Sequence, residues 1–231
     1  MDKQTEEILN LLQNCSRQQR EFIFNYLRKE IKIHKIENKL NIDAEIILEA
    51  INKDVTGLTF RMMRGVIAEA AFEIEVLKKL KEWEDITPAG DLPFDFLIRD
   101  KMGPISIQVK LQRSIKQQPM MANQAVKKFS ENLFVVETQK TRGGIDQGSG
   151  EDTRPYRFGE FDILAVAMQP SSGKWSDFMY TVSNWLLPAK DGSDKILKFQ
   201  PVSANVNEDW TNDIETAIEW YRKQIKKTIA F

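Results

Sequence analysis

The chain has 231 residues, of which 33 are Lys or Arg and 34 are Asp or Glu, and its formal net charge is −1. Its single cysteine (Cys15) excludes an intrachain disulfide framework and a multi-thiolate zinc site, and its single histidine (His34) makes a His-dependent triad hard to build. Hydrolytic chemistry would therefore rest on carboxylates, lysines and an oxygen-liganded metal. With no apolar run near about 18 residues and no apolar leader, we expect a cytoplasmic protein without a membrane span.

The small net charge hides an uneven distribution. Residues 101–157 carry a net charge of +5, whereas residues 1–100 carry −4 and residues 158–231 carry −2. A basic middle between acidic flanks is what a phosphate-binding surface would look like, although a chance fluctuation gives the same pattern. Charge alone therefore leaves nucleic-acid binding as one interpretation among several.

The N-terminal part of the chain predicts a helical lobe. Apolar residues at helical spacing favour two helices over residues 3–30, with Ser16 capping the second. A third helix is expected at about 43–53. Residues 1–56 thus form a lobe for which a helix-turn-helix over 33–53 and a small bundle for packing or dimerisation are alternatives.

Residues 57–231 predict a mixed sheet flanked by helices, an α/β arrangement of the α+β type. The expected elements are a long helix at 59–83, strands at 94–98 and 105–111, a helix at 119–129, strands at 132–138, 161–168 and 178–187, and a helix at 208–228. The residues expected on the inward face of the long helix include Met63, Val66, Ile67, Ala70 and Ile74. A Gly-rich polar loop at 141–153 is expected to be mobile without a ligand.

Three segments carry the residues suited to catalysis. Asp95 enters the first strand after Pro93-Phe94, and Gln108-Val109-Lys110 lies on the strand expected to pair with it. Gln108 and Lys110 are two residues apart and share one face, while the Val109 carbonyl can face the edge near Asp95. Glu69 lies on the long helix, within Arg64-Gly-Val-Ile-Ala-Glu69.

These residue types suit a magnesium site. Mg²⁺ takes hard oxygen ligands and keeps several waters, and Asp95, the Val109 carbonyl and a second acid would supply such ligands. Lys110 beside them could orient or deprotonate a water, or stabilise charge that develops on phosphorus. Phosphodiester cleavage needs these parts and requires no histidine or cysteine.

The order and spacing of Glu69, Asp95, Gln108 and Lys110 resemble the PD-(D/E)XK nuclease superfamily and, within it, the type II restriction endonucleases. The Arg-Gly-x-x-Ala-Glu segment also looks like the helix of Holliday-junction resolvases in that superfamily. The resemblance covers about residues 60–140. It implies a restriction-endonuclease-like core in which Asp95 and Glu69 bind Mg²⁺, directly or through water, and Lys110 serves the attacking water.

Gln108 departs from the family pattern, which commonly has Asp or Glu at this position. A glutamine oxygen is a neutral ligand, so we expect weaker metal binding by a site made of Asp95, Glu69, the Val109 carbonyl and Gln108. Other branches of the superfamily, including modification-dependent restriction enzymes, also use Gln there.

Two further acids leave alternatives open. Glu73 shares the helix face of Glu69 and competes for its role, and either could be a solvated surface acid. The Arg-Gly-x-x-Ala-Glu context favours Glu69. Asp162, early in a core strand, is expected to form an ion pair with Arg157 or another basic residue, and a second metal role is the alternative.

Basic and amide side chains follow the catalytic strand and bracket the Gly-rich loop. Cations near the metal would neutralise phosphates, and Arg and Gln can read base edges in the major groove. Each could singly be an ordinary surface residue, whereas the cluster favours a function. The candidate DNA contacts are Arg113, Lys116, Gln117, Lys140, Arg142, Gln147, Arg154 and Arg157.

We therefore expect a Mg²⁺-dependent endodeoxyribonuclease that cleaves double-stranded DNA at a specific short sequence, as a type II restriction enzyme does. The resemblance implies a homodimer in which each subunit cuts one strand, with residues 1–56 or the C-terminal helix as the interface. The alternatives are a repair or junction-resolving nuclease of the same superfamily, and a non-catalytic DNA-binding protein. The loop and the helical lobe argue for sequence recognition, and Gln108 suggests the non-catalytic alternative.

Overall fold

The computed structural model describes residues 2–31, 37, 39, 42–53, 57–140, 143–148 and 150–231. The chain divides into two compact units, Met1–Arg61 and Met62–Phe231. His34, Arg142 and part of the segment considered for a helix-turn-helix lie outside the described residues. In the part of the chain that is described, no helix combines the length and the apolar character needed to cross a bilayer.

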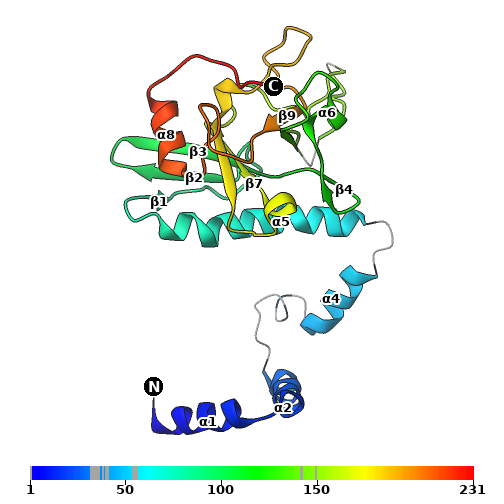
Figure 1. The fold of residues 1–231 in the computed structure, drawn as a ribbon, viewed down its shortest axis with the longest axis vertical. Coiled ribbons are helices and arrows are strands. Elements are labelled where there is room, and N and C mark those ends of the chain that lie inside the picture. The colour runs from blue at the N-terminus through cyan, green and yellow to red at the C-terminus, as the bar shows by residue number, and fades with distance from the viewer. Residues whose placement is uncertain are drawn as a thin grey trace. The chain divides into compact units, whose positions relative to one another are not determined.

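The first unit contains the three predicted helices, which are α1 (Lys3–Asn14), α2 (Arg17–Glu30) and α4 (Ala44–Asn52) (Figure 1). Ser16 starts α2 through a capping box, because its hydroxyl accepts from the Gln19 N–H and the Gln19 side chain accepts from the Ser16 N–H. The predicted division at Ser16 is therefore confirmed. Among the described residues of this unit, Glu37 alone is buried, so its apolar side chains stay largely exposed.

The second unit is built on a five-stranded mixed sheet in the order β1-β2-β3-β7-β8. These strands are β1 (Glu84–Asp85), β2 (Phe96–Asp100), β3 (Gly103–Leu111), β7 (Ile163–Ala167) and β8 (Phe178–Val182). β3 and β7 run parallel and the other neighbours antiparallel, which confirms the predicted mixed sheet. Two small pairs accompany it, β4 (Ser114–Ile115) with β5 (Gln118–Pro119), and β6 (Phe134–Glu137) with β9 (Phe199–Val202).

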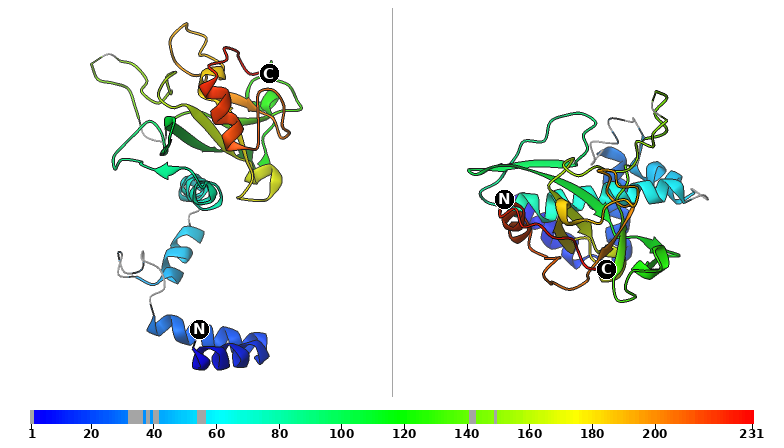
Figure 2. Two further views of the ribbon diagram at one scale, coloured as in Figure 1. Left: turned by 90° about the vertical axis from the view of Figure 1, so that its left-hand side faces the viewer. Right: turned by 90° about the horizontal axis from the view of Figure 1, so that it is seen from above.

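Helices α5 (Leu58–Glu75) and α8 (Ile214–Arg222) cover opposite faces of this sheet (Figures 1 and 2). The Phe72 ring of α5 contacts the rings of Phe96 in β2 and Phe178 in β8, with centroids 5.4 and 5.3 Å apart. All five residues of β7 are buried, as a strand covered on both faces requires. The remaining helical turns are η1 (Leu77–Lys79), α6 (Ala122–Ala125), α7 (Gln169–Ser172) and η2 (Ser183–Trp185).

The inward face of α5 differs from the prediction. Ala68 and Phe72 are buried, whereas Val66, Ile67 and Ile74 are exposed. The helix is apolar on two sides, so periodicity could not choose between them; the side that presents Phe72 fills the space above β2 and β8. The helix also ends at Glu75 rather than near residue 83, and η1 follows.

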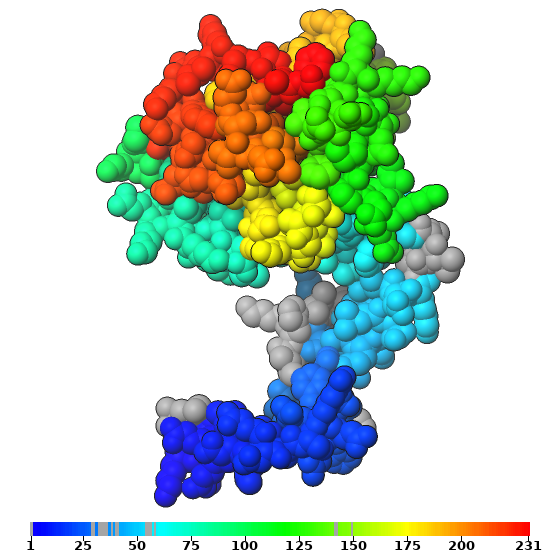
Figure 3. Space-filling view, viewed as in Figure 1, coloured from blue at the N-terminus to red at the C-terminus, as the bar shows by residue number. Residues whose placement is uncertain are grey.

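Other predicted elements are shorter in the structure. The expected helix at 119–129 is reduced to α6, and the expected strand at 178–187 gives way to η2 after Val182. The last helix starts at its Asp213 cap and ends at Arg222, because the chain leaves the helix to bury Ile229, whose N–H donates to the Trp185 carbonyl. Figure 3 shows this C-terminal segment in red on the surface of the second unit.

Candidate active site

The β2–β3 hairpin anchors the Asp95 carboxylate against β3. Phe96 pairs with Ile107, and the Asp95 N–H donates to the Ile107 carbonyl at 3.0 Å. Asp95 Oδ2 then accepts from the Val109 N–H at 2.7 Å and from Gln108 Nε2 at 2.5 Å. The hairpin thus brings Asp95 beside Gln108 and Val109, as the spacing predicts.

Two oxygens converge on the Gln108 amide nitrogen. Besides Asp95 Oδ2, Nε2 contacts the Val109 carbonyl oxygen at 3.2 Å, and Gln108 is only 2% exposed. Both oxygens are acceptors, so the amide nitrogen rather than the amide oxygen faces them. A carboxylate and a carbonyl that face one point in a buried site form the core of a hard-cation site.

Glu69 of α5 and Lys110 of β3 complete the charged group. Burial raises the pKa of Glu69, the negative charge of Asp95 raises it further, and Lys110 opposes both effects. Burial also raises the pKa of Asp95, against the effects of Lys110 and the Val109 N–H. Burial lowers the pKa of Lys110, although Asp95 and Glu69 counter it. Three mutually interacting groups whose charges are opposed by burial are typical of catalytic sites.

Tyr156 is a member of this site that sequence reasoning missed. Its buried ring lies 5.2 Å from Lys110 Nζ and 5.4 Å from Lys140 Nζ, measured to the ring centroid. It stacks edge-on against Phe161, at 5.3 Å between ring centroids. The one available signal was an aromatic residue between Arg154 and Arg157 just before a core strand.

The donor set fits a magnesium ion that keeps part of its water shell. Asp95 and Glu69 supply two carboxylates, and the Val109 carbonyl supplies a neutral oxygen. The described residues contain no cluster of three or more His, Cys, Asp or Glu side chains that could hold a metal. Any cation here would therefore rely on two carboxylates and on neutral oxygens, as Mg²⁺ commonly does.

No protein-family model and no curated protein is similar enough to this chain to match it. Among solved structures, the chain is similar to a bacterial homing endonuclease, I-Ssp6803I, with 19% sequence identity and a TM-score of 0.36. The similarity covers 70% of this chain and 91% of that chain. At this TM-score it carries no argument about this protein, whose site is interpreted from its own geometry.

The two remaining acids, Glu73 and Asp162, have partners outside the group around Asp95. Glu73 pairs with Lys78 at 3.0 Å on the surface of α5. The expected ion pair between Asp162 and Arg157 is wrong: Asp162 Oδ2 accepts from the Ser106 N–H and hydroxyl, both at 2.8 Å. A neighbouring strand supplies these donors, and this pairing across the sheet could not be derived from sequence separation.

The Gly-rich segment forms a two-stranded ribbon over its described residues. The Lys140 N–H donates to the Arg154 carbonyl at 2.9 Å, and the Thr153 N–H donates to the Gly144 carbonyl at 2.9 Å. Further along, Ile145 bridges Asp152. The segment expected as a Gly-rich polar loop thus contains paired backbone among its described residues, at Lys140 with Arg154 and at Gly144 with Thr153.

The seven expected DNA contacts that lie within the described residues divide into two groups. Arg113, Lys140 and Arg157 are bonded to the carboxylates of Glu137, Glu160 and Glu151. The exposed members are Lys116, Gln117, Gln147 and Arg154. Lys116 and Gln117 form the tight turn between β4 and β5, where both have positive φ angles of 49° and 64°.

Proposed function

We propose that this protein is a Mg²⁺-dependent endodeoxyribonuclease that cleaves double-stranded DNA at a specific short sequence, in the manner of a type II restriction enzyme. The convergence of Asp95 Oδ2 and the Val109 carbonyl oxygen on one buried point carries the proposal, since Glu69 and Lys110 both interact electrostatically with Asp95. This combination supplies metal ligands and a positioned amine without any histidine or cysteine.

Each residue of the site has a distinct role in the proposed reaction. Asp95, Glu69 and the Val109 carbonyl would hold Mg²⁺, which when bound neutralises phosphate charge and lowers the pKa of water. Lys110 Nζ, as the neutral amine, orients the attacking water and takes its proton as the new oxygen–phosphorus bond forms. The bond from phosphorus to the 3′-oxygen breaks, a water molecule protonates the 3′-oxygen, and the product keeps a 5′-phosphate. Tyr156 holds Lys110 in place through its ring face.

The ribbon supports sequence-specific recognition over simple phosphodiester cleavage. A two-stranded β-ribbon fits the major groove of B-DNA, and Arg and Gln side chains read base edges there. Gln147 and Arg154 are exposed on this ribbon. A junction-resolving or repair nuclease is the runner-up, and a DNA-binding protein without activity is the alternative that Gln108 favours.

A second copy of the chain is the proposed partner, bound through α1 and α2. Phe22 and Tyr26, four residues apart on one side of α2, are each more than half exposed. Burial of exposed apolar side chains of this kind is a main source of stability in a protein–protein interface. The exposed aliphatic residues nearby in the sequence are Ile8, Leu9, Leu11, Leu27 and Ile31. Two copies would also supply two sites, one for each DNA strand.

Cleavage of long DNA with Mg²⁺ tests the proposed activity. Wild-type protein is expected to give discrete bands, and Lys110→Ala is expected to lower the cleavage rate by about 10²–10⁴-fold, the usual contribution of a positioned proton-transfer group. A smear of fragments would favour a nonspecific nuclease, and binding without cutting would favour the regulatory protein. A protein that neither binds nor cuts DNA would contradict the proposal outright.

Asp95→Ala separates catalysis from binding. Loss of the carboxylate removes a metal ligand and a negative charge near phosphate, so cutting is expected to fall below detection while DNA binding is kept or tightened. Electrophoretic mobility shifts in EDTA, together with thermal unfolding, provide the measurement. An unfolded Asp95→Ala protein would show that Asp95 stabilises the β2–β3 hairpin and is needed for folding.

A further inference from the structure

The Gln108 side chain stands where the proposed cation would bind. Its amide nitrogen lies 2.5 Å from Asp95 Oδ2 and 3.2 Å from the Val109 carbonyl oxygen. Those are two of the oxygens that would ligate Mg²⁺. An amide nitrogen is a donor that carries partial positive charge, so it satisfies both oxygens in place of a cation.

We propose that Gln108 is a two-state amide switch: its nitrogen occupies the cation position in the metal-free protein, and its oxygen faces that position when a divalent cation is bound. The inference rests on the proposed metal site and adds a second role for this residue. Rotation about the terminal side-chain bond exchanges nitrogen and oxygen with almost no change in volume. The exchange therefore needs no repacking around a residue that is 2% exposed.

The switch gives a physical reason for glutamine where an acid would bind metal more tightly. A glutamate at this position would place a third carboxylate beside Asp95 and Glu69 in a buried site, which is costly without a cation. Glutamine keeps the metal-free hairpin hydrogen-bonded, but the cation must first break the bond between Nε2 and Asp95. We therefore expect wild-type protein to be stable without metal and to bind Mg²⁺ weakly.

Gln112 is a matched internal control for this behaviour. It lies just past the end of β3 and is 1% exposed, but its Oε1 accepts from the Ser171 N–H at 3.1 Å. Its Nε2 is buried without a hydrogen-bond partner among the described residues. A cation bound at Asp95 is therefore expected to leave the Gln112 side-chain amide where it is.

Side-chain amide NMR of ¹⁵N-labelled full-length protein tests the switch directly. On titration with Mg²⁺, the Gln108 NH₂ signals are expected to shift along the binding curve measured by calorimetry and to lose protection from hydrogen exchange. The Gln112 signals are expected to stay in place. Gln108→Glu and Gln112→Glu assign the two residues by loss of their signals.

The two possible failures are distinguishable. Mg²⁺ binding that Asp95→Asn abolishes, with an unmoved Gln108 amide, would overturn the switch alone. No Mg²⁺ binding, or binding that Asp95→Asn leaves unchanged, would overturn the metal site and the switch together.

Thermal unfolding of Gln108 variants, with and without Mg²⁺, is a second test of the switch. Without metal, Gln108→Glu is expected to lower the Tm by roughly 3–6 °C, because it adds a buried charge. With Mg²⁺, the Tm of Gln108→Glu is expected to return to the wild-type value. This variant is also expected to bind Mg²⁺ at least about tenfold more tightly than wild type, since ligand charge sets affinity. Gln108→Met removes donor and ligand, so its Tm should fall without any gain in affinity. A Gln108→Glu protein with wild-type Tm and Mg²⁺ affinity would contradict the switch.

Discussion

At the scale of single residues, the site depends on how Lys110 is held. Its amine faces the Tyr156 ring, which also faces Lys140 at the base of the ribbon. Lys140 is in turn bonded to Glu160 at 2.6 Å. The ring therefore contacts both the Lys110 amine and the start of the ribbon.

Tyr156→Leu is expected to lower kcat about fivefold with little change in KM, because a cation–π contact of roughly 1 kcal/mol orients Lys110. Tyr156→Phe keeps the ring face and is expected to stay within about twofold of wild type. Steady-state cleavage of a duplex substrate measures both values, with thermal unfolding as the check on folding. Equal losses in the two variants would show that the hydroxyl group acts, rather than the ring.

At the scale of elements, an ion pair ties the β2–β3 hairpin to α8. Arg222 Nη2 lies 2.6 Å from Asp100 Oδ1, and Arg222 also stacks on Trp83 at 5.2 Å from the ring centroid. The hydrogen bond from Arg222 lowers the pKa of Asp100 to about 2. Because the hairpin carries Asp95 and Gln108, this contact supports the site from a distance.

The pH dependence of this contact follows from the direction of its pKa shift. The pKa of Asp100 is lower in the folded protein than the ordinary value of 3.8, so its stabilising effect is present above about pH 4. That effect is lost as the pH falls toward 2. Asp100→Asn is therefore expected to destabilise the protein at pH 7, and the difference from wild type should shrink toward zero near pH 2.

Denaturant unfolding at both pH values measures this difference. Glu84→Gln is the matched control, because Glu84 pairs with Arg99 at 2.7 Å on the neighbouring strand but both side chains are more than half exposed. Exposed pairs contribute little, so this variant is expected to match wild type within about 1 kcal/mol at both pH values. An Asp100→Asn difference that does not change with pH would point to packing instead of charge.

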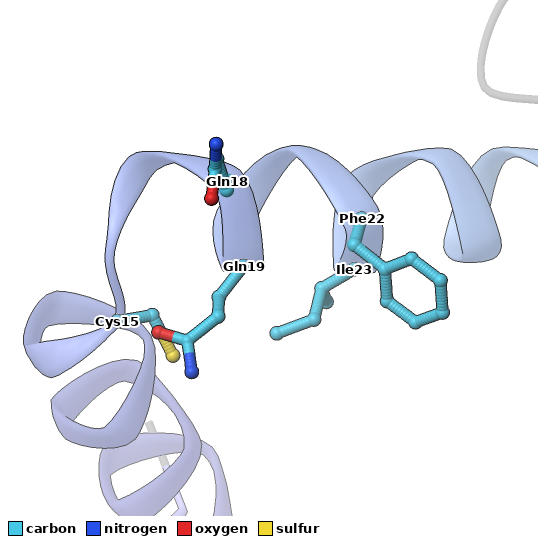
Figure 4. Close-up of a pocket in the computed structure, with 5 residues that line it drawn as sticks. All are labelled: Cys15, Gln18, Gln19, Phe22 and Ile23. Atoms are coloured by element: carbon cyan, nitrogen blue, oxygen red, sulfur yellow. The ribbon is translucent and has the colours of Figure 1, made fainter.

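The N-terminal helices make a separate prediction about assembly. A shallow pocket between the end of α1 and α2 is lined by Cys15, Gln18, Gln19, Phe22 and Ile23 (Figure 4). Phe22→Ser is expected to weaken dimerisation at least about tenfold, since burying one aromatic side chain contributes roughly 1.5–3 kcal/mol. Sedimentation equilibrium over a range of concentrations measures the association.

Ile145→Ser serves as the control for assembly, because Ile145 is similarly exposed at 67% but lies on the ribbon. Its dimerisation is expected to match wild type. A wild-type protein that stays monomeric at all concentrations, or a Phe22→Ser protein that dimerises normally, would rule out this interface.

At the scale of the whole molecule, charge is arranged by region. The basic stretch 101–157 contains β3, the β4–β5 turn and the ribbon, and it includes Lys110 of the proposed site and Lys140, which contacts the same Tyr156 ring. Several of these cations are neutralised by internal ion pairs, as Arg113 is by Glu137. The proposed phosphate-binding surface is therefore smaller than the net charge of the stretch indicates.

Substitutions of two exposed cations, Lys116 and Arg154, are therefore expected to change DNA affinity in different ways with salt concentration and with DNA sequence. Lys116→Ala is expected to weaken binding to all sequences alike and to reduce the slope of log K against log salt by about 1. Arg154→Ala is expected to cost about 1–3 kcal/mol on the preferred site and to relax discrimination at one base pair. Fluorescence anisotropy at several salt concentrations, on specific and random duplexes, separates the two. Identical behaviour of both variants would contradict base reading by Arg154.

By itself, the sequence determined the local features of this protein. The spacing of Asp95 from Gln108 and Lys110, the break at Ser16 and the mixed sheet all follow from hairpin geometry, capping and periodicity, which act over short stretches of chain. Tertiary structure decided what depends on distant partners. It turned the Val66 side of α5 to solvent, assigned Asp162 to Ser106 and placed Tyr156 against Lys110. Such pairings are selected by packing and desolvation across the core, which sequence periodicity does not encode.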